Sequence, residues 1–120
     1  MRVSEIARIL DKNDRVVIIV SKDAVKAKAL LREVDLLVTT KLNDAATRVR
    51  RYENGSVAYA ATPGTNFRGM CIHLILVLND VSESDVQRLK TDYFPVVSSG
   101  GIGKMIVETE EMPFLPFVDL

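Results

Sequence analysis

The sequence predicts an α/β domain of three layers, in which helices cover both faces of a mostly parallel sheet of about five to six strands. Two apolar runs, at residues 16–20 and 72–78, lack the alternation of a strand with one wet face, so we expect both faces of each to be covered. Segments with helical periodicity separate the predicted strands along the chain. This alternation is typical of β-α-β units and of parallel sheets.

The length of the chain, 120 residues, is that of one domain, so we expect residues 1–120 to form a single α/β domain. The one cysteine, Cys71, cannot form an internal disulfide, which fits a reducing compartment. No apolar stretch reaches the roughly 20 residues of a membrane-spanning helix, and the N-terminus lacks the apolar region of a signal peptide. We therefore expect a soluble, cytoplasmic protein without a membrane partner.

The charges of the chain balance, with 16 Lys and Arg against 16 Asp and Glu. A protein that binds nucleic acid through bulk electrostatics normally has a basic excess, so this balance argues against that class. A net charge near zero also removes the repulsion that keeps copies of a protein apart. Self-association is therefore not opposed.

The first half of the chain predicts a β-α-β unit between two further helices. Apolar residues three and four positions apart predict a short helix over residues 3–12, ahead of the strand at 16–20. A second helix is expected over residues 22–33 and a second strand over 35–40, parallel to the first strand. A third helix is expected from residue 43 or 44 to about residue 52.

The second half begins with another strand and the longest loop. Residues 56–61 alternate larger and smaller side chains, which predicts a strand, and residues 62–69 contain the Pro and Gly of a loop. The apolar run at 72–78 is the predicted central strand. Ser82 is the expected N-cap of a helix that extends to about residue 91.

The C-terminal part predicts an antiparallel hairpin at one edge of the sheet. Short strands are expected over residues 94–99 and 104–108, joined by a glycine-rich turn. The alternative fold is a ferredoxin-like α+β sandwich, in which residues 16–40 and 72–98 form two β-α-β halves and residues 42–61 are an insertion. No identity between the two halves establishes a repeat.

Small and polar residues follow most of the predicted strands. In an open parallel sheet, ligands bind beyond the carboxyl ends of the strands, where hydroxyls and helix N-termini can hold an anion such as phosphate. The same residue types also cap helices and form turns, and this structural explanation stays open. The candidate ligand-binding residues are Ser21, Lys22, Thr39, Thr40, Lys41, Gly64, Thr65, Asn66, Asn79, Asp80, Ser98, Ser99, Gly100 and Gly101.

The glycine-rich segment at residues 98–104 does not match a phosphate-binding loop. A Walker loop needs Gly where this chain has Ser98, and Ser or Thr where it has Met105. The dinucleotide-binding pattern fails as well, because no glycine stands three residues after Gly103. The segment also precedes a predicted strand rather than a helix. A hairpin turn is the preferred interpretation.

Cys71 and His73 stand two residues apart, so on a strand they share a face. Zinc needs three or four ligands, and the chain has no second Cys or His. Both residues belong to the most apolar segment, where a thiol is usually inert. We therefore expect core packing for both, no metal site, and a hydrogen-bond partner for His73 that the sequence does not identify. No cofactor is identified either.

Two other groups of side chains predict contacts with partners. Arg48, Arg50 and Arg51 could contact phosphates of RNA, although they lack interleaved aromatic residues. The tail at residues 112–120 is apolar, and its prolines keep it out of a central strand. We expect this tail and the edge hairpin to form a homodimer interface. Its apolar residues are Phe114, Leu115, Phe117 and Val118.

Three functions remain open from the sequence. The preferred one is a non-catalytic binding or regulatory module that dimerises and binds a small anionic ligand at the strand ends. The alternatives are an enzyme that acts on a phosphorylated or carboxylated small molecule at the same edge, and an RNA-contacting accessory domain. Convergence of Lys22, Lys41 and Ser98, with Asp80, would favour the enzyme. If Lys22, Lys41 and Ser98 are scattered instead, the hypothesis of a ligand site at the strand ends fails.

Overall fold

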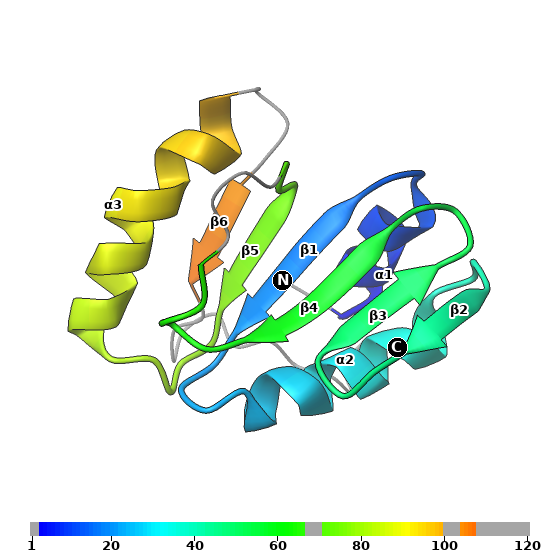
Figure 1. Ribbon diagram of the computed structural model, residues 1–120, viewed down its shortest axis with the longest axis horizontal. Helices are drawn as coiled ribbons and strands as arrows, with labels where there is room; N and C mark the ends of the chain where they lie inside the picture. Colours follow the sequence, from blue (N-terminus) through cyan, green and yellow to red (C-terminus); the bar gives the residue numbers. More distant parts are fainter. Residues whose placement is uncertain (1–2, 67–70, 100–103, 108–120) are drawn as a thin grey trace.

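The structure of this protein is a computed structural model that describes residues 3–66, 71–99 and 104–107. Within these residues the chain forms a compact α/β domain of three helices around one six-stranded mixed sheet (Figure 1). The predicted α/β class is confirmed. None of the helices in the described ranges is long and apolar enough to cross a membrane.

Four parallel strands form the middle and one side of the sheet. β1 (Val16–Val20) lies between β4 (Val57–Ala61) and β5 (Leu74–Val77), and β6 (Lys104–Val107) lies beyond β5. All four residues of β5 are buried, as the apolar run predicts, and β5 has a parallel partner on each side, but β4 and β1 rather than β5 occupy the two central places of the sheet.

The other side of the sheet is an antiparallel hairpin, formed where the sequence predicted a third helix. β2 (Leu42–Ala45) pairs with β3 (Val49–Tyr52), and β3 pairs with β4, which gives the order β2-β3-β4-β1-β5-β6. The helix prediction was wrong because Arg50 and Tyr52, two residues apart, both bond to one side chain on a neighbouring helix. Residues at that spacing share a face on a strand but not on a helix.

The helix α2 (Val25–Leu37) includes the start of the predicted second strand, so the strand at 35–40 was wrong. Its buried residues have helical spacing, whereas Leu36 is 79% exposed and Leu37 41% exposed. These two leucines, which favoured a strand in the sequence, lie on the exposed side of the last turn of α2. The buried residues of α2 are Ala27, Leu30, Leu31 and Val34.

The helix α3 (Glu83–Ser99) continues through Pro95, so the strand predicted at 94–99 was also wrong. An interior proline removes one helical hydrogen bond, which made a break the expected outcome. Because α3 continues, the chain returns to the opposite edge of the sheet and β6 runs parallel to β5. The predicted edge hairpin is therefore absent from the described residues, and so are the two halves of the ferredoxin-like alternative.

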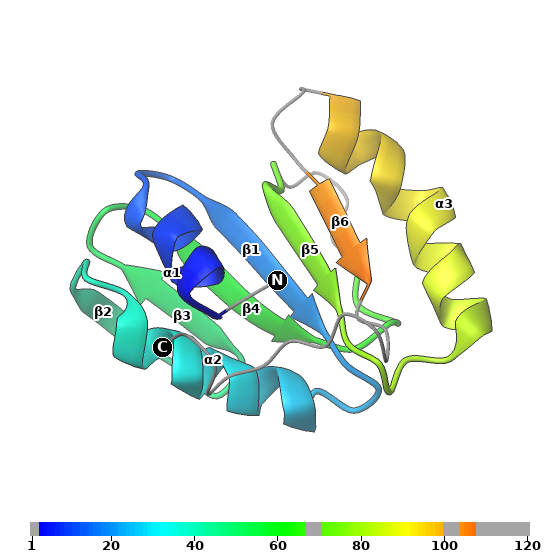
Figure 2. The same cartoon turned by 180° about the vertical axis from the view of Figure 1, so that it is seen from behind.

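Helices cover the sheet from both sides. α1 (Val3–Asp11) and α2 lie on one face and α3 on the other (Figures 1 and 2). On β1, Val17 and Ile19 belong to the core cluster that includes α1 and α2, while Ile18 and Val20 belong to the cluster that includes α3. All four are 0% exposed, which confirms the expectation that both faces of β1 are covered.

Candidate functional site

The chain leaves β1 and β5 in opposite directions at the carboxyl edge of the sheet. β1 leads to α2 on one face, whereas the neighbouring β5 leads to α3 on the other (Figure 1). Two adjacent parallel strands with diverging connections define a topological switch point, where open α/β sheets bind ligands. The candidate site is therefore the edge between these two connections, which we call the switch-point edge and define by Ser21, Lys22, Lys26, Asn79 and Asp80.

The connection from β1 to α2 uses its own side chains to cap the helix. The buried Ser21 accepts a hydrogen bond at Oγ from the Ala27 N–H (3.2 Å), and Oδ1 of Asp23 accepts one from the Val25 N–H (3.1 Å). Two N–H groups of the first turn of α2 are therefore occupied. An anion at this edge would be held mainly by side chains, not by the helix N-terminus as the sequence suggested.

A side-chain hydrogen bond joins the two connections. Nζ of Lys26, in the first turn of α2, donates to Oδ1 of Asn79, which follows β5, at 3.0 Å. Both residues are exposed. Lys22 is exposed as well, and no hydrogen bond or ion pair of its side chain is found within the described ranges. Two cationic groups thus lie at the switch-point edge.

Asp80 is the unusual member of the site. Its Oδ1 is buried and has no hydrogen-bond partner in the described part of the chain. The backbone holds this residue in place on one side, because the Leu78 N–H donates to the Val20 carbonyl of β1 (2.9 Å) and the Val81 N–H to the Leu78 carbonyl (3.2 Å). A buried polar atom without a partner costs free energy, and such an atom in a native protein calls for an explanation.

The loop after β4 borders the same edge and is attached to α3. Thr62 and Thr65 bond to each other through their hydroxyls (3.3 Å) and through a backbone hydrogen bond (3.1 Å). Arg88 of α3 donates to the Pro63 carbonyl (2.9 Å) and forms an ion pair with Asp85 (3.1 Å). Both helices that flank the switch point thus contribute a cationic residue that fastens a neighbouring segment.

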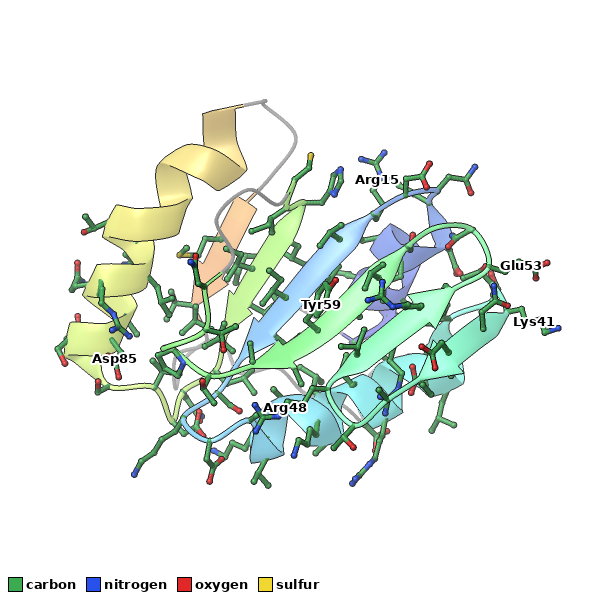
Figure 3. All side chains as sticks on the ribbon, viewed as in Figure 1. Arg15, Lys41, Arg48, Glu53, Tyr59 and Asp85 are labelled. Carbon is green, nitrogen blue, oxygen red and sulfur yellow. The ribbon has the colours of Figure 1, made fainter. Side chains whose placement is uncertain are left out.

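Other predicted site residues lie at the amino edge of the sheet. The N–H groups of Thr39 and Thr40 both donate to Oδ1 of Asp11, the last residue of α1, at 2.9 and 3.0 Å. Lys41 follows Thr40, and its carbonyl accepts a hydrogen bond from the Glu53 N–H (2.8 Å) at the open end of the hairpin, opposite the turn between β2 and β3 (Figure 3). Lys22 and Lys41 do not converge.

The serines near residue 100 do not join the switch-point edge either. Ser98 and Ser99 belong to the last turn of α3, which ends at the amino edge, ahead of β6. The ligand site that the sequence predicted across all the strand ends therefore fails in that form, and only some of its residues share one edge. Gly100, Gly101 and the predicted interface residues Phe114, Leu115, Phe117 and Val118 lie outside the described residues. The candidates that the structure brings to the carboxyl edge are Ser21, Lys22, Gly64, Thr65, Asn66, Asn79 and Asp80.

Two cationic residues near this edge were missed from the sequence, Lys26 and Arg88. Lys26 stands in the first turn of α2, so it could have been found by listing the charged residues of each helix start, not only those between strand and helix. Arg88 lies in the second turn of α3, and nothing in the sequence connects it with the loop after β4.

Cys71 and His73 precede β5 at the amino edge, and neither packs as predicted. Cys71 is exposed, so the expectation of a buried thiol was wrong. His73 is half-buried, and its Nδ1 accepts a hydrogen bond from the Val16 N–H (3.0 Å). Burial, and then the charge of Arg15, lower the pKa of His73 from its usual value of 6.5. Among the described residues, no three His, Cys, Asp or Glu side chains form a group that could hold a metal ion.

The arginine cluster on residues 48–51 is divided by the hairpin. Arg50 is 9% exposed and forms an ion pair with Asp35 of α2 (2.7 Å), so it is not available to a partner. Arg48 and Arg51 are exposed. Two arginines, not three, therefore remain for the RNA contact considered above.

No protein-family model matches this sequence, and no curated protein shows significant similarity to it. The function has to be inferred from the geometry of the switch-point edge.

Proposed function

We propose that this protein binds a small phosphorylated molecule, as its magnesium complex, at the switch-point edge. The observation that carries the proposal is the buried Oδ1 of Asp80, which has no partner within the described ranges. It lies at the end of a strand that adjoins the topological switch point, where open α/β sheets bind ligands.

The carboxylate of Asp80 explains why a metal ion belongs to the proposal. A phosphate alone would be repelled by this charge, whereas a divalent cation would bind the carboxylate of Asp80 and the phosphate together. Mg²⁺ keeps several of its waters and is usually held by one or two carboxylates and by the phosphates of the substrate.

The lysines of the edge explain the preference for phosphate. Lys22 and Lys26 are exposed and make no ion pair in the described part, so their charges are available. Charge-assisted hydrogen bonds from ammonium groups to phosphate are about twice as strong as neutral ones. Together, the ammonium groups of Lys22 and Lys26 and the carboxylate of Asp80 favour an anion that carries a divalent cation over either ion alone.

Binding of magnesium pyrophosphate and of magnesium ATP would test this proposal by thermal shift and by titration calorimetry. A ligand at a hundredfold excess over its Kd stabilises the folded state by about 2.7 kcal/mol. We expect stabilisation that requires magnesium and that Asp80→Asn abolishes. Asp44→Asn is the matched control, because Asp44 is an exposed carboxylate on the hairpin. Equal binding by Asp80→Asn and the natural chain, or binding that EDTA leaves unchanged, would overturn the proposal.

The other predicted activities remain predictions. Homodimer formation through residues 112–120 concerns a segment outside the described residues and is tested by sedimentation of the chain at high concentration. An RNA contact would now rest on Arg48 and Arg51, and an enzymatic reaction would require turnover of the bound phosphate compound. Salt-dependent RNA binding and release of inorganic phosphate are the respective measurements.

A further inference from the structure

Lys26 and Asn79 form a bridge between the two connections that diverge at the switch point. Lys26 belongs to the first turn of α2 and Asn79 to the segment between β5 and α3, 53 residues later in the chain. Their hydrogen bond, 3.0 Å from Nζ to Oδ1, connects elements that lie on opposite faces of the sheet. It therefore lies across the switch-point edge.

The hydrogen bond between Lys26 and Asn79 is weak because its side chains are exposed and its acceptor is uncharged. Both side chains are exposed, so the bond competes with water and contributes little to folding. The acceptor is a neutral amide oxygen, and Lys26 makes no ion pair with the carboxylate of Asp80 or with any other described group. A phosphate oxygen is a better acceptor for an ammonium group than an amide is. An anion at this edge would thus compete successfully for Lys26.

We propose that Lys26 is the phosphate-sensing residue of the site and that its bond to Asn79 is a latch that the ligand opens. This inference rests on the proposed function. In the free protein Nζ of Lys26 lies on Asn79, and in the bound protein it lies on the phosphate. The latch favours an anionic ligand, because Lys26 gains more from a phosphate oxygen than from the neutral amide oxygen of Asn79.

The two members of the latch have opposite expected effects on affinity. Lys26→Gln removes the cation, so we expect affinity for magnesium pyrophosphate to fall at least tenfold. Asn79→Ala frees Lys26 from its competitor, so we expect affinity to rise by a factor of about two to five, because Lys26 no longer gives up a weak exposed hydrogen bond when the phosphate binds. A purely structural bridge would give a loss, or no change, for both variants.

Titration calorimetry with magnesium pyrophosphate on the full chain tests this pair of effects. Lys90→Gln is the matched control, because Lys90 is an exposed lysine of α3 in its second turn, and we expect its affinity to equal that of the natural chain. Circular dichroism spectra establish that each variant is folded.

The outcomes separate this inference from the proposed function. If the natural chain shows no magnesium-dependent binding, both fall. The proposed function stands if the natural chain binds magnesium pyrophosphate and Asp80→Asn does not. The latch is wrong if, at the same time, Lys26→Gln binds as tightly as the control Lys90→Gln. A loss of affinity in Asn79→Ala equal to that in Lys26→Gln also overturns the latch, since it would make Asn79 a ligand contact.

Discussion

The guanidinium of Arg50 lies against the carboxylate of Asp35, with Nε 2.7 Å from Oδ2, and this ion pair attaches the hairpin to α2. The hydroxyl of Tyr52 donates to the other carboxylate oxygen at 2.8 Å, so both oxygens of Asp35 are occupied. Burial, followed by the hydrogen bond to Asp35 and its charge, raises the pKa of Tyr52. The hairpin thus depends on one acidic side chain of the neighbouring helix.

Removal of that acidic side chain should destabilise the protein strongly. Asp35→Ala leaves the guanidinium of Arg50, whose side chain is only 10% exposed, without its counter-charge. We expect the free energy of unfolding in urea to fall by about 2–4 kcal/mol, because breaking a buried pair leaves an uncompensated charge. Asp85→Ala breaks the pair with Arg88, whose side chains are 41% and 50% exposed, and should cost less than about 1 kcal/mol. Equal losses in the two variants would contradict this account.

A second prediction concerns Gly55, in the turn between β3 and β4. Its φ is +88°, and an added Cβ would lie 2.0 Å from Oδ1 of Asp14. A side chain is strained in this region of backbone conformation, so Gly55→Ala should lower the free energy of unfolding by about 1–2 kcal/mol. Gly64→Ala serves as the control, because nothing lies within 4 Å of its added Cβ, and we expect a change within about 0.5 kcal/mol. Thermal denaturation compares the two.

The hydrogen bond between His73 and the backbone of β1 predicts a pH dependence of stability. Nδ1 accepts from the Val16 N–H only when the imidazole is neutral at that nitrogen, and the pKa of His73 is lowered in the folded protein. The unfolded chain therefore takes up a proton first as the pH falls below 6.5, its usual value. The contribution of His73 to stability is complete above pH 6.5 and is lost between that value and the lowered pKa.

Urea titrations between pH 8 and pH 5 measure this contribution. The stability of the natural chain should decrease below pH 6.5 more steeply than that of His73→Gln, so that the difference between the two narrows as the pH falls. Parallel curves over the whole range would show that the protonation of His73 is not linked to folding.

The exposure of Cys71 gives a fourth prediction. An exposed thiol reacts without unfolding, so a thiol reagent such as Ellman's should modify one cysteine per chain under native conditions. The rate should approach that of the chain in concentrated urea. Reaction only after denaturant is added would mean that the thiol is buried, as the apolar sequence around it suggested.

The strands that are buried on both faces could be predicted from local pattern, and so could α1 and the edge strand β6, whereas the hairpin and the ends of α2 and α3 could not. Val17 to Val20 form a β-branched run whose pattern is independent of any partner. Leu36, Leu37 and Pro95 instead mislead a local interpretation, because the end of α2 exposes two leucines and α3 continues past a proline. The hairpin depends on Asp35, which lies outside residues 42–52. The pattern of those residues alone therefore cannot predict it.

The residues of the candidate site could be predicted only where the strand before them was predicted correctly. The residues that directly follow β1 and β5 reach the carboxyl edge because those two strands were correctly placed. Thr39 to Lys41 were assigned to that edge only through a strand that does not exist there, and Ser98 through another. Lys26 could not be paired with Asn79 in advance, because the bond depends on where α2 begins and on which face of the sheet it lies.

The central position of β1 has a consequence for the order of events during synthesis. Val16 pairs with Val57 and Val17 with Leu74, so β4, the first partner strand of β1 to be translated, follows it by some forty residues. At about 5–20 residues per second, β1 waits for roughly 2–8 s without a neighbour along either edge. Only α1 and α2 are close enough in sequence to cover it meanwhile, and on one face alone. The nascent chain should therefore be most prone to aggregate just before β4 leaves the ribosome, and slowing translation after residue 20 should lower its soluble yield.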